Sequence, residues 1–191
     1  MDQLVQIDST SMGDATAFRS LADLQVAFGA LPPAPRTTGR LALIVRRGPG
    51  GVREAPRSLD VTIDGGVPGD SWGRQSAPNG EMQIAVMQMN VAEMLANGQS
   101  PLLFGDSLFV DLDLSVGNLP TGSRVRIGGA LVEVTPMPHN GCRKFRGRFG
   151  PDALRFVSEP ALRERRLRGI YVRVVADGTV ACSDGIEVLS R

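Results

Sequence analysis

The sequence predicts a mainly β protein built as a barrel, with a few peripheral helices and one helix near the N-terminus. Three observations favour this fold class. The 191 residues suffice for one substantial domain with its own core. The 23 glycines and 13 prolines are spread through the chain, which indicates many turns between short elements. Roughly eight short apolar or alternating runs follow one another at spacings typical of a barrel or a sandwich.

The N-terminal region has a different pattern from the rest of the chain. Residues 1–11 are polar and are predicted to be loose. An amphipathic helix follows, in which Asp14 can cap the start and Gly29 can end it. Three prolines within residues 31–35 then predict a stiff, extended connector. The chain therefore divides into an N-terminal helical extension with its Pro-rich connector over residues 1–38 and a barrel domain over residues 39–191.

Strands are predicted wherever apolar or alternating runs lie between turn residues. These runs are 41–45, 59–63, 83–87, 107–114, 124–127, 131–134, 170–175 and 186–189. Gly128-Gly129 joins the pair at 124–127 and 131–134 as a hairpin, and Asp177-Gly178 is predicted to form a second tight turn, between Val175 and Val180.

Helices within the barrel domain are predicted from capping residues and prolines. Asn90 can cap a helix that has Glu93 in the capping-box position and ends at Asn97-Gly98. Shorter helices are predicted to begin near Pro151 and Pro160.

Composition excludes several classes of partner and fold. A net charge of +1 offers no general attraction for nucleic acid or a membrane surface. Two cysteines are too few for a disulfide scaffold or an iron–sulfur cluster. No apolar run is long enough to cross a membrane, and no signal peptide is evident. We therefore expect a cytoplasmic protein with both thiols reduced.

The most informative stretch is the Pro-rich loop 136–148, which follows the predicted strand 131–134 and contains Cys142. Four cationic residues come within six positions after this cysteine: Arg143, Lys144, Arg146 and Arg148. Nearby cations favour the thiolate, which is the nucleophilic and metal-binding form of the side chain. The loop therefore predicts a reactive or metal-ligating thiol, the alternative being a small buried hydrophobic residue among solvated arginines.

The single histidine and the single lysine of the chain lie in the same loop. His139 is three residues before Cys142 and could form a Cys–His catalytic pair with it, or could be an ordinary surface or core residue. Two cysteines and one histidine at these spacings do not form a closed zinc site. Lys144 is the one candidate for a pyridoxal phosphate Schiff base, and nothing around it resembles a phosphate cup, so we exclude that cofactor.

Two further sets of polar residues admit both functional and structural interpretations. Asp70 follows a glycine-rich turn at a strand end, where its carboxylate could line a site or could hydrogen-bond its own turn. Four arginines within residues 163–168 could grip a phosphate or could form a solvated helix face.

Four segments of the sequence, in order, resemble the MOSC domain. They are the glycine-rich turn Gly65–Asp70, the strand pair within Leu119–Thr135, the cysteine segment Cys142–Phe145 and the closing segment Arg168–Asp184. The resemblance covers about Leu41 to Leu189. Asp106-Ser107 stands where this family often has a Glu-Asn pair.

This resemblance implies a β-barrel in which Cys142 ligates molybdenum in a pterin cofactor, or instead carries a sulfane sulfur as a persulfide. A soft thiolate suits such a metal, and cationic neighbours suit the phosphate of the cofactor. The residues expected to hold the cofactor are Asp70, Asp106, Arg143, Lys144, Arg146 and Arg168.

Three functions remain open from the sequence. The first is a molybdenum-dependent oxidoreductase that acts on N-hydroxylated small molecules and receives electrons from a partner protein. The second is a sulfur carrier that takes its sulfur from a donor protein. The third is a small-ligand-binding barrel without chemistry, which the Asp106-Ser107 departure favours.

Overall fold

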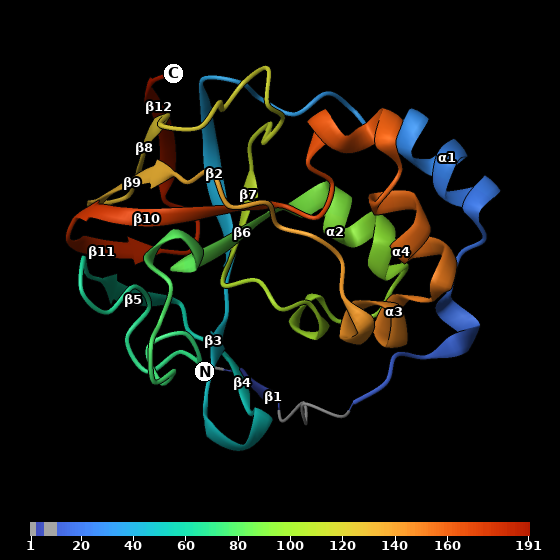
Figure 1. Cartoon of the computed structure of the whole chain (residues 1–191), viewed down its shortest axis with the longest axis horizontal. Helices are drawn as coiled ribbons and strands as arrows, with labels where there is room; N and C mark the ends of the chain where they lie inside the picture. The colour runs from blue at the N-terminus through green and yellow to red at the C-terminus, as the bar shows by residue number, and fades with distance from the viewer. Residues whose placement is uncertain (1–2, 6–10) are drawn as a thin grey trace.

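The computed structural model describes residues 3–5 and 11–191, and it contains seven strands closed into a barrel (Figure 1). In order around the barrel these are β10 (Ile170–Ala176), β6 (Ile84–Gln88), β7 (Leu108–Asp111), β2 (Thr38–Ile44), β12 (Gly185–Ser190), β8 (Arg124–Ile127) and β9 (Ala130–Val134). Neighbouring strands are antiparallel except β6 and β7, which are parallel. Because an odd number of strands cannot alternate in direction all the way round, one parallel pair is required. The predicted fold class is confirmed.

Aliphatic side chains fill the barrel, and the burial of each strand depends on what covers its outer face. In β8 and β10 buried and exposed residues alternate, as expected when only one face meets the core. In β6 and β7 both faces are buried. Val86 and Val110 point into the barrel cluster, whereas Met87 and Phe109 belong to a second cluster beneath the helices. The predicted hairpin at Gly128-Gly129 joins β8 to β9.

A layer of helices lies on one side of the barrel (Figure 1). It consists of α1 (Leu21–Gly29), α2 (Met89–Ala96), α3 (Arg143–Phe149) and α4 (Pro151–Val157). Short 3₁₀ turns are η1 (Ala15–Ala17), η2 (Pro49–Gly51), η3 (Gly80–Met82), η4 (Pro101–Leu103) and η5 (Pro160–Arg165). The short helices predicted near Pro151 and Pro160 are confirmed as α4 and η5. Among the described residues, no helix has the length and apolar character needed to span a membrane.

The predicted N-terminal helix is two elements rather than one. Asp14 caps η1, where its carboxylate accepts a hydrogen bond from the Thr16 amide at 2.9 Å. Ser20 has extended backbone and caps α1, so the chain restarts as a helix directly before its apolar run. The predicted end at Gly29 is confirmed. This helix is part of the same core as the barrel domain, since Leu24 is fully buried.

Two small sheets lie outside the barrel. In one, β4 (Arg53–Ala55) lies between β1 (Gln3–Val5) and β3 (Arg46–Arg47). In the other, β11 (Gly178–Ala181) pairs with β5 (Ser58–Val61). The N-terminal segment that was predicted to be loose therefore contributes a strand at residues 3–5. The remainder of that prediction, at residues 1–2 and 6–10, lies outside the described residues.

Two local predictions are wrong. Helix α2 begins at Met89, two residues earlier than a cap at Asn90 would give, and Asn90 lies inside its first turn, where its side-chain oxygen accepts a hydrogen bond from Gln88 at 2.7 Å. Asp177-Gly178 is not a hairpin turn, because β11 pairs with β5 rather than with β10. The Asp177 carboxylate instead accepts a hydrogen bond from the Ile63 amide at 2.8 Å, which makes this point a corner where the chain leaves the barrel.

Candidate functional site

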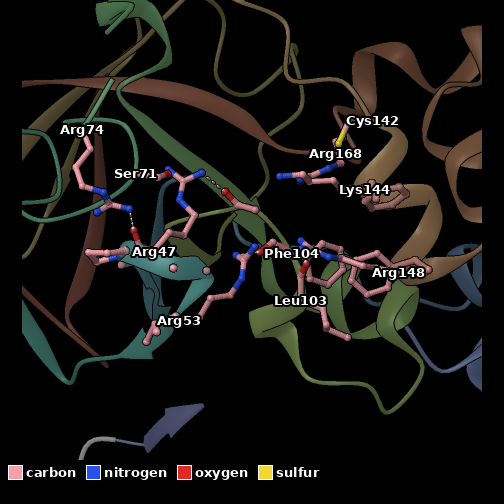
Figure 2. A pocket seen from close by; sticks show the side chains of 18 residues that line it. Arg47, Arg53, Ser71, Arg74, Leu103, Phe104, Cys142, Lys144, Arg148 and Arg168 are labelled. Atoms are coloured by element: carbon pink, nitrogen blue, oxygen red, sulfur yellow. Dashed lines mark hydrogen bonds between the residues drawn. The ribbon is translucent and has the colours of Figure 1, made fainter. Parts of the chain in front are cut away.

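A cavity of about 540 Å³ lies between the β3–β4 loop and helix α3 (Figure 2). This volume is within the usual range for a small-molecule or cofactor site. The lining comes from segments far apart in the sequence: 47–53, 71–74, 103–105, 142–149 and residue 168. Figure 2 shows Arg47 and Arg74 at one end of the cavity and Cys142 and Lys144 at the other. The barrel and the helical layer thus bring a turn from the first third of the chain opposite the cysteine loop.

The cavity is strongly cationic. Its lining contains six cationic side chains and no aspartate or glutamate, the cations being Arg47, Arg53, Arg74, Lys144, Arg148 and Arg168. A concave surface lined by one sign of charge concentrates ions of the other sign, and arginines bind phosphate and carboxylate with paired hydrogen bonds. The cavity is therefore suited to an anionic ligand.

Cys142 has a side chain exposed to this cavity and occupies the position directly before α3. Gly141 sets the path of the chain here. A Cβ at Gly141 would lie 2.4 Å from Cδ1 of Leu154 in α4, so a larger residue would require that side chain to move. The loop thus packs closely against α4, and the Cys142 thiol lies next to it at the cavity.

An aromatic wall adjoins the cysteine. The rings of Phe104 and Phe149 are stacked with centroids 4.0 Å apart, and the Phe145 ring is 5.1 Å from that of Phe149. All three are buried. The guanidinium of Arg168 lies over two of these rings, 5.2 Å from the centroid of Phe145 and 5.8 Å from that of Phe104. The cavity lined by Cys142 therefore also has an apolar surface with a cation over it.

Asp70, a predicted cofactor-binding residue, holds Arg47 in place and does not line the cavity itself. Its buried carboxylate accepts hydrogen bonds from Arg47 Nη2 at 2.5 Å, from Arg47 Nε and from the Arg47 backbone amide at 2.7 Å. It also accepts from the Trp72 amide at 3.1 Å, so it bonds its own turn as well. Burial acts to raise the pKa of Asp70, but the hydrogen bonds and charge of Arg47 outweigh it and the pKa is lowered.

Asp106 holds Arg168 in place in the way that Asp70 holds Arg47. The Asp106 carboxylate is fully buried and accepts a hydrogen bond from Arg168 Nη1 at 2.6 Å. It too is absent from the cavity lining. Of the residues predicted to hold a cofactor, the two aspartates thus act behind the cavity wall, while Lys144 and Arg168 line the cavity directly.

His139 is separated from Cys142 by the geometry of the loop. It lines a second cavity of about 390 Å³, which shares Arg168 with the first but does not include Cys142 in its lining. The imidazole lies against the Tyr171 ring, with centroids 4.4 Å apart, and its Nδ1 is 3.4 Å from Asp106 Oδ1. Burial lowers the pKa of His139 to about 4, with the charges of Arg168 and Arg47 adding to this effect against that of Asp106. The structure therefore does not bring the predicted Cys–His pair together.

Arg143 and Arg146 are exposed and face away from the Cys142 cavity. They line a third hollow of about 620 Å³, together with Lys144, Arg148 and Met12. The predicted cationic cluster after the cysteine is thus divided between two surfaces of α3.

Sequence reasoning missed three arginines of the cavity lining, namely Arg47, Arg53 and Arg74. Arg53 is buried, donates a hydrogen bond to the Phe104 carbonyl at 2.5 Å, and has its pKa lowered to about 10, first by burial and then by the charges of Arg148 and Arg47. Arg74 donates to the Arg47 carbonyl at 2.8 Å. The one available signal was Arg47 directly before the run Gly48–Gly51, which reads as an ordinary turn.

Among the described residues, no group of three or more histidine, cysteine or acidic side chains is arranged to hold a metal ion. Cys142 is also the one histidine, cysteine or acidic residue in the cavity lining, so a metal bound there would take a single such ligand from that lining. That arrangement is compatible with a metal whose other ligands belong to an organic cofactor.

Fold and site together define a β-barrel protein with an exposed thiol in an arginine-lined cavity. The profile of the MOSC domain family matches residues 74–187, which is more than half of the chain, and the chain belongs to this family. The resemblance found in the sequence is thereby confirmed.

Solved structures show the same fold. The YuaD protein from Bacillus subtilis is 19% identical with a TM-score of 0.60, over 83% of this chain and 100% of that one. YiiM from Escherichia coli is 21% identical with a TM-score of 0.53, over 80% of this chain and 70% of that one. Comparison with curated proteins gives no match. At these identities the structural likeness shows the barrel and nothing finer.

Proposed function

We propose that this protein binds a molybdenum–pterin cofactor, with Cys142 as the protein ligand to the metal. The observation that carries the proposal is the juxtaposition of one exposed thiol with six cationic side chains in a cavity of about 540 Å³. Membership of the MOSC family supports it, since this domain is associated in general with the molybdenum cofactor.

The residues present fit such a group. Arg47 and Arg74 would hold its phosphate at the end of the cavity remote from the thiol, with Arg53 between them and Phe104 (Figure 2). At the other end the thiolate of Cys142 is a soft ligand of the kind that this metal accepts. The phenylalanines beside Cys142 offer apolar contact to a planar ring. When bound, the cofactor would supply a metal centre able to exchange two electrons with a substrate.

The activity that we propose for the loaded protein is reduction of N-hydroxylated small molecules. Conversion of an N–OH group to N–H takes up two electrons and two protons and releases water. Lys144 lines the cavity two residues after Cys142, and its ammonium group carries three N–H donors. We assign Lys144 the role of donating a proton to the departing hydroxyl oxygen.

Electrons for this reaction would come from a partner protein, because two cysteines cannot hold an iron–sulfur cluster. The exposed side chains of Arg143, Lys144 and Arg146 lie next to Cys142 on α3 and would favour an acidic partner surface there.

The test is the molybdenum and pterin content of the protein after expression in a cofactor-producing host. We expect close to one equivalent of each in the native protein and a loss of bound metal in Cys142→Ala. The matched control is Cys182→Ala, because Cys182 lies outside the cavity and its thiol contacts the Pro56 carbonyl. Equal metal content in native protein and Cys142→Ala, or none in either, would contradict the proposal.

A sulfur carrier is the second candidate, and it is favoured by the exposure of Cys142 to solvent beside exposed cations. In that function the Cys142 thiolate would attack the outer sulfur of a donor persulfide, the donor S–S bond would break with release of the donor thiolate, and Cys142 would hold the sulfur as its own persulfide. Cyanide-labile sulfur on Cys142, in protein free of metal, would distinguish this function. A protein with neither metal nor labile sulfur would match a ligand-binding barrel without chemistry.

A further inference from the structure

Buried polar atoms without a hydrogen-bond partner gather at one place in the described part of the chain. The described residues contain six such side-chain atoms. Four of the six form the cluster, and they belong to Asp106, Ser107, His139 and Arg168. Native proteins contain few unsatisfied buried polar groups, so a cluster of them calls for a physical explanation.

Two of these atoms face each other. His139 Nδ1 and Asp106 Oδ1 are 3.4 Å apart, and a shift of about 0.5 Å would bring them to hydrogen-bond distance. The other oxygen of Asp106 already accepts the 2.6 Å hydrogen bond from Arg168. A buried chain His139–Asp106–Arg168 therefore runs through the wall between the two cavities, since Arg168 lines both and His139 lines the second.

The Arg168 guanidinium depends on this chain for its place. It is buried over the rings of Phe104 and Phe145. Apart from Asp106, its one side-chain hydrogen-bond partner among the described residues is the Met87 sulfur, 3.6 Å from Nη1. A guanidinium in such surroundings needs a fixed counter-charge. Asp106 supplies that charge, and the orientation of Asp106 depends in turn on what its second oxygen accepts.

We propose that His139 is a positioning residue, which donates a hydrogen bond from Nδ1 to Asp106 and thereby holds the Arg168 guanidinium beside Cys142. This inference rests on the proposed function, because it concerns the same cavity. It assigns His139 a role on Arg168 in place of the acid–base role on Cys142 that its sequence position predicts. A neutral imidazole suits this role, since the charge of Asp106 is then balanced by Arg168 alone.

The hydrogen bond fixes which ring nitrogen carries the proton, and the single histidine makes this directly measurable. Long-range proton–nitrogen NMR correlations of untagged protein distinguish the two neutral tautomers. We expect the Nδ1–H form, unchanged between pH 5 and 8. An Nε2–H form, or titration near pH 6.5, would overturn the proposal.

A matched pair of variants tests the consequence for the cavity. His139→Asn places an amide donor where Nδ1 lies, whereas His139→Gln places it nearer the position of Nε2, and neither changes the net charge at neutral pH. The readout is the alkylation rate of Cys142 by iodoacetate divided by that by iodoacetamide, in a Cys182→Ser background. This ratio reports the positive potential that an anionic reagent meets at the thiol.

We expect His139→Asn to keep the native ratio and His139→Gln to lower it about two- to threefold, the effect of displacing one unit charge near the thiol. Asp184→Asn is the control for a merely structural loss, because Asp184 caps the Ala181 turn and lines neither cavity. It should lower the melting temperature without changing the ratio. Equal ratios in the two His139 variants would overturn the proposal.

The alkylation assay needs no bound cofactor, so the two proposals fail separately. If Cys142→Ala leaves metal content unchanged, the proposed function fails whatever the His139 variants show. If metal binding depends on Cys142 but the two His139 variants behave alike, the positioning role alone is refuted.

Discussion

The buried pair of Asp70 and Arg47 allows a quantitative prediction for the substitution Asp70→Asn. The Asp70 side chain is 2% exposed and that of Arg47 is 23% exposed. Removing one partner of a fully buried ion pair costs about 3–5 kcal/mol, because the other charge is left uncompensated. Arg47 can rehydrate in part, and the asparagine oxygen can still accept one of the backbone hydrogen bonds. We therefore expect a loss of about 2 kcal/mol in the free energy of unfolding.

For a domain of this size, that loss corresponds to a fall of about 4–8 °C in Tm. The assay is thermal unfolding followed by circular dichroism. Glu54→Gln provides the matched control, because it removes the partner of the adjacent arginine, Arg46, in a pair whose side chains are 38% and 27% exposed. Exposed pairs contribute about 0–1 kcal/mol, so the control should change Tm by less than about 3 °C.

The pH dependence supplies a second check on the same variant. Because the pKa of Asp70 is lowered in the folded protein, its stabilising effect is present above the unfolded pKa of about 3.9 and is lost as the pH falls through the folded value. The difference in Tm between native protein and Asp70→Asn should be constant from pH 5 to 8 and narrow below pH 4. Equal Tm values for Asp70→Asn and Glu54→Gln at neutral pH would refute the reasoning.

Three further predictions concern side chains of the two cavities. Lys144→Gln should lower kcat for reduction of an N-hydroxylated substrate about 10²-fold or more in steady-state kinetics, while metal content is retained. An unchanged kcat would show that Lys144 is not the proton donor. The pKa of His139 is about 4 in the folded protein, against an ordinary value of 6.5 in the unfolded chain. Between these two pH values the unfolded chain binds one more proton than the folded protein, so the free energy of unfolding declines as the pH is lowered through this window. Urea unfolding at pH 7 and 4.5 should show a decline about 2.5 kcal/mol larger in native protein than in His139→Phe. Arg53→Met should raise or maintain Tm, because it removes a buried cation whose pKa is already lowered to about 10. The same variant should weaken the protection that pyrophosphate gives Cys142 against alkylation about tenfold. A lower Tm with unchanged protection would contradict a ligand-binding role for Arg53.

The strands of the barrel were predictable because their signals are local. Alternation of buried and exposed residues within β8 and β9, and the glycine pair between them, specify a hairpin within eleven residues of sequence. The wrong assignments arose where a local signal competes with a distant partner. Asp177-Gly178 has the residues of a tight turn, but β5 lies more than a hundred residues earlier in the chain and captures the strand that follows.

The cysteine of the site was predictable, whereas most of its surroundings were not. Cys142 and Lys144 share one cationic loop, so their neighbourhood is visible in the sequence. Arg47 and Arg53 reach the same cavity from about ninety residues away, through a small sheet that no periodicity indicates. His139 shows the converse: it is close to Cys142 in the sequence, yet the loop directs the two side chains into different cavities.

The two aspartates explain how so many arginines can surround one cavity. Asp70 and Asp106 were expected to contact a cofactor, but a carboxylate in the lining would repel an anionic ligand. Each is instead buried behind the wall and paired with one arginine, Arg47 and Arg168 respectively. This arrangement supplies the counter-charge that a partly buried guanidinium needs and keeps both carboxylates out of the cavity lining. In Asp106 the shorter carboxylate, where the family often has glutamate, still reaches Arg168 at 2.6 Å, so the departure from the family pattern is compatible with a ligand-binding cavity.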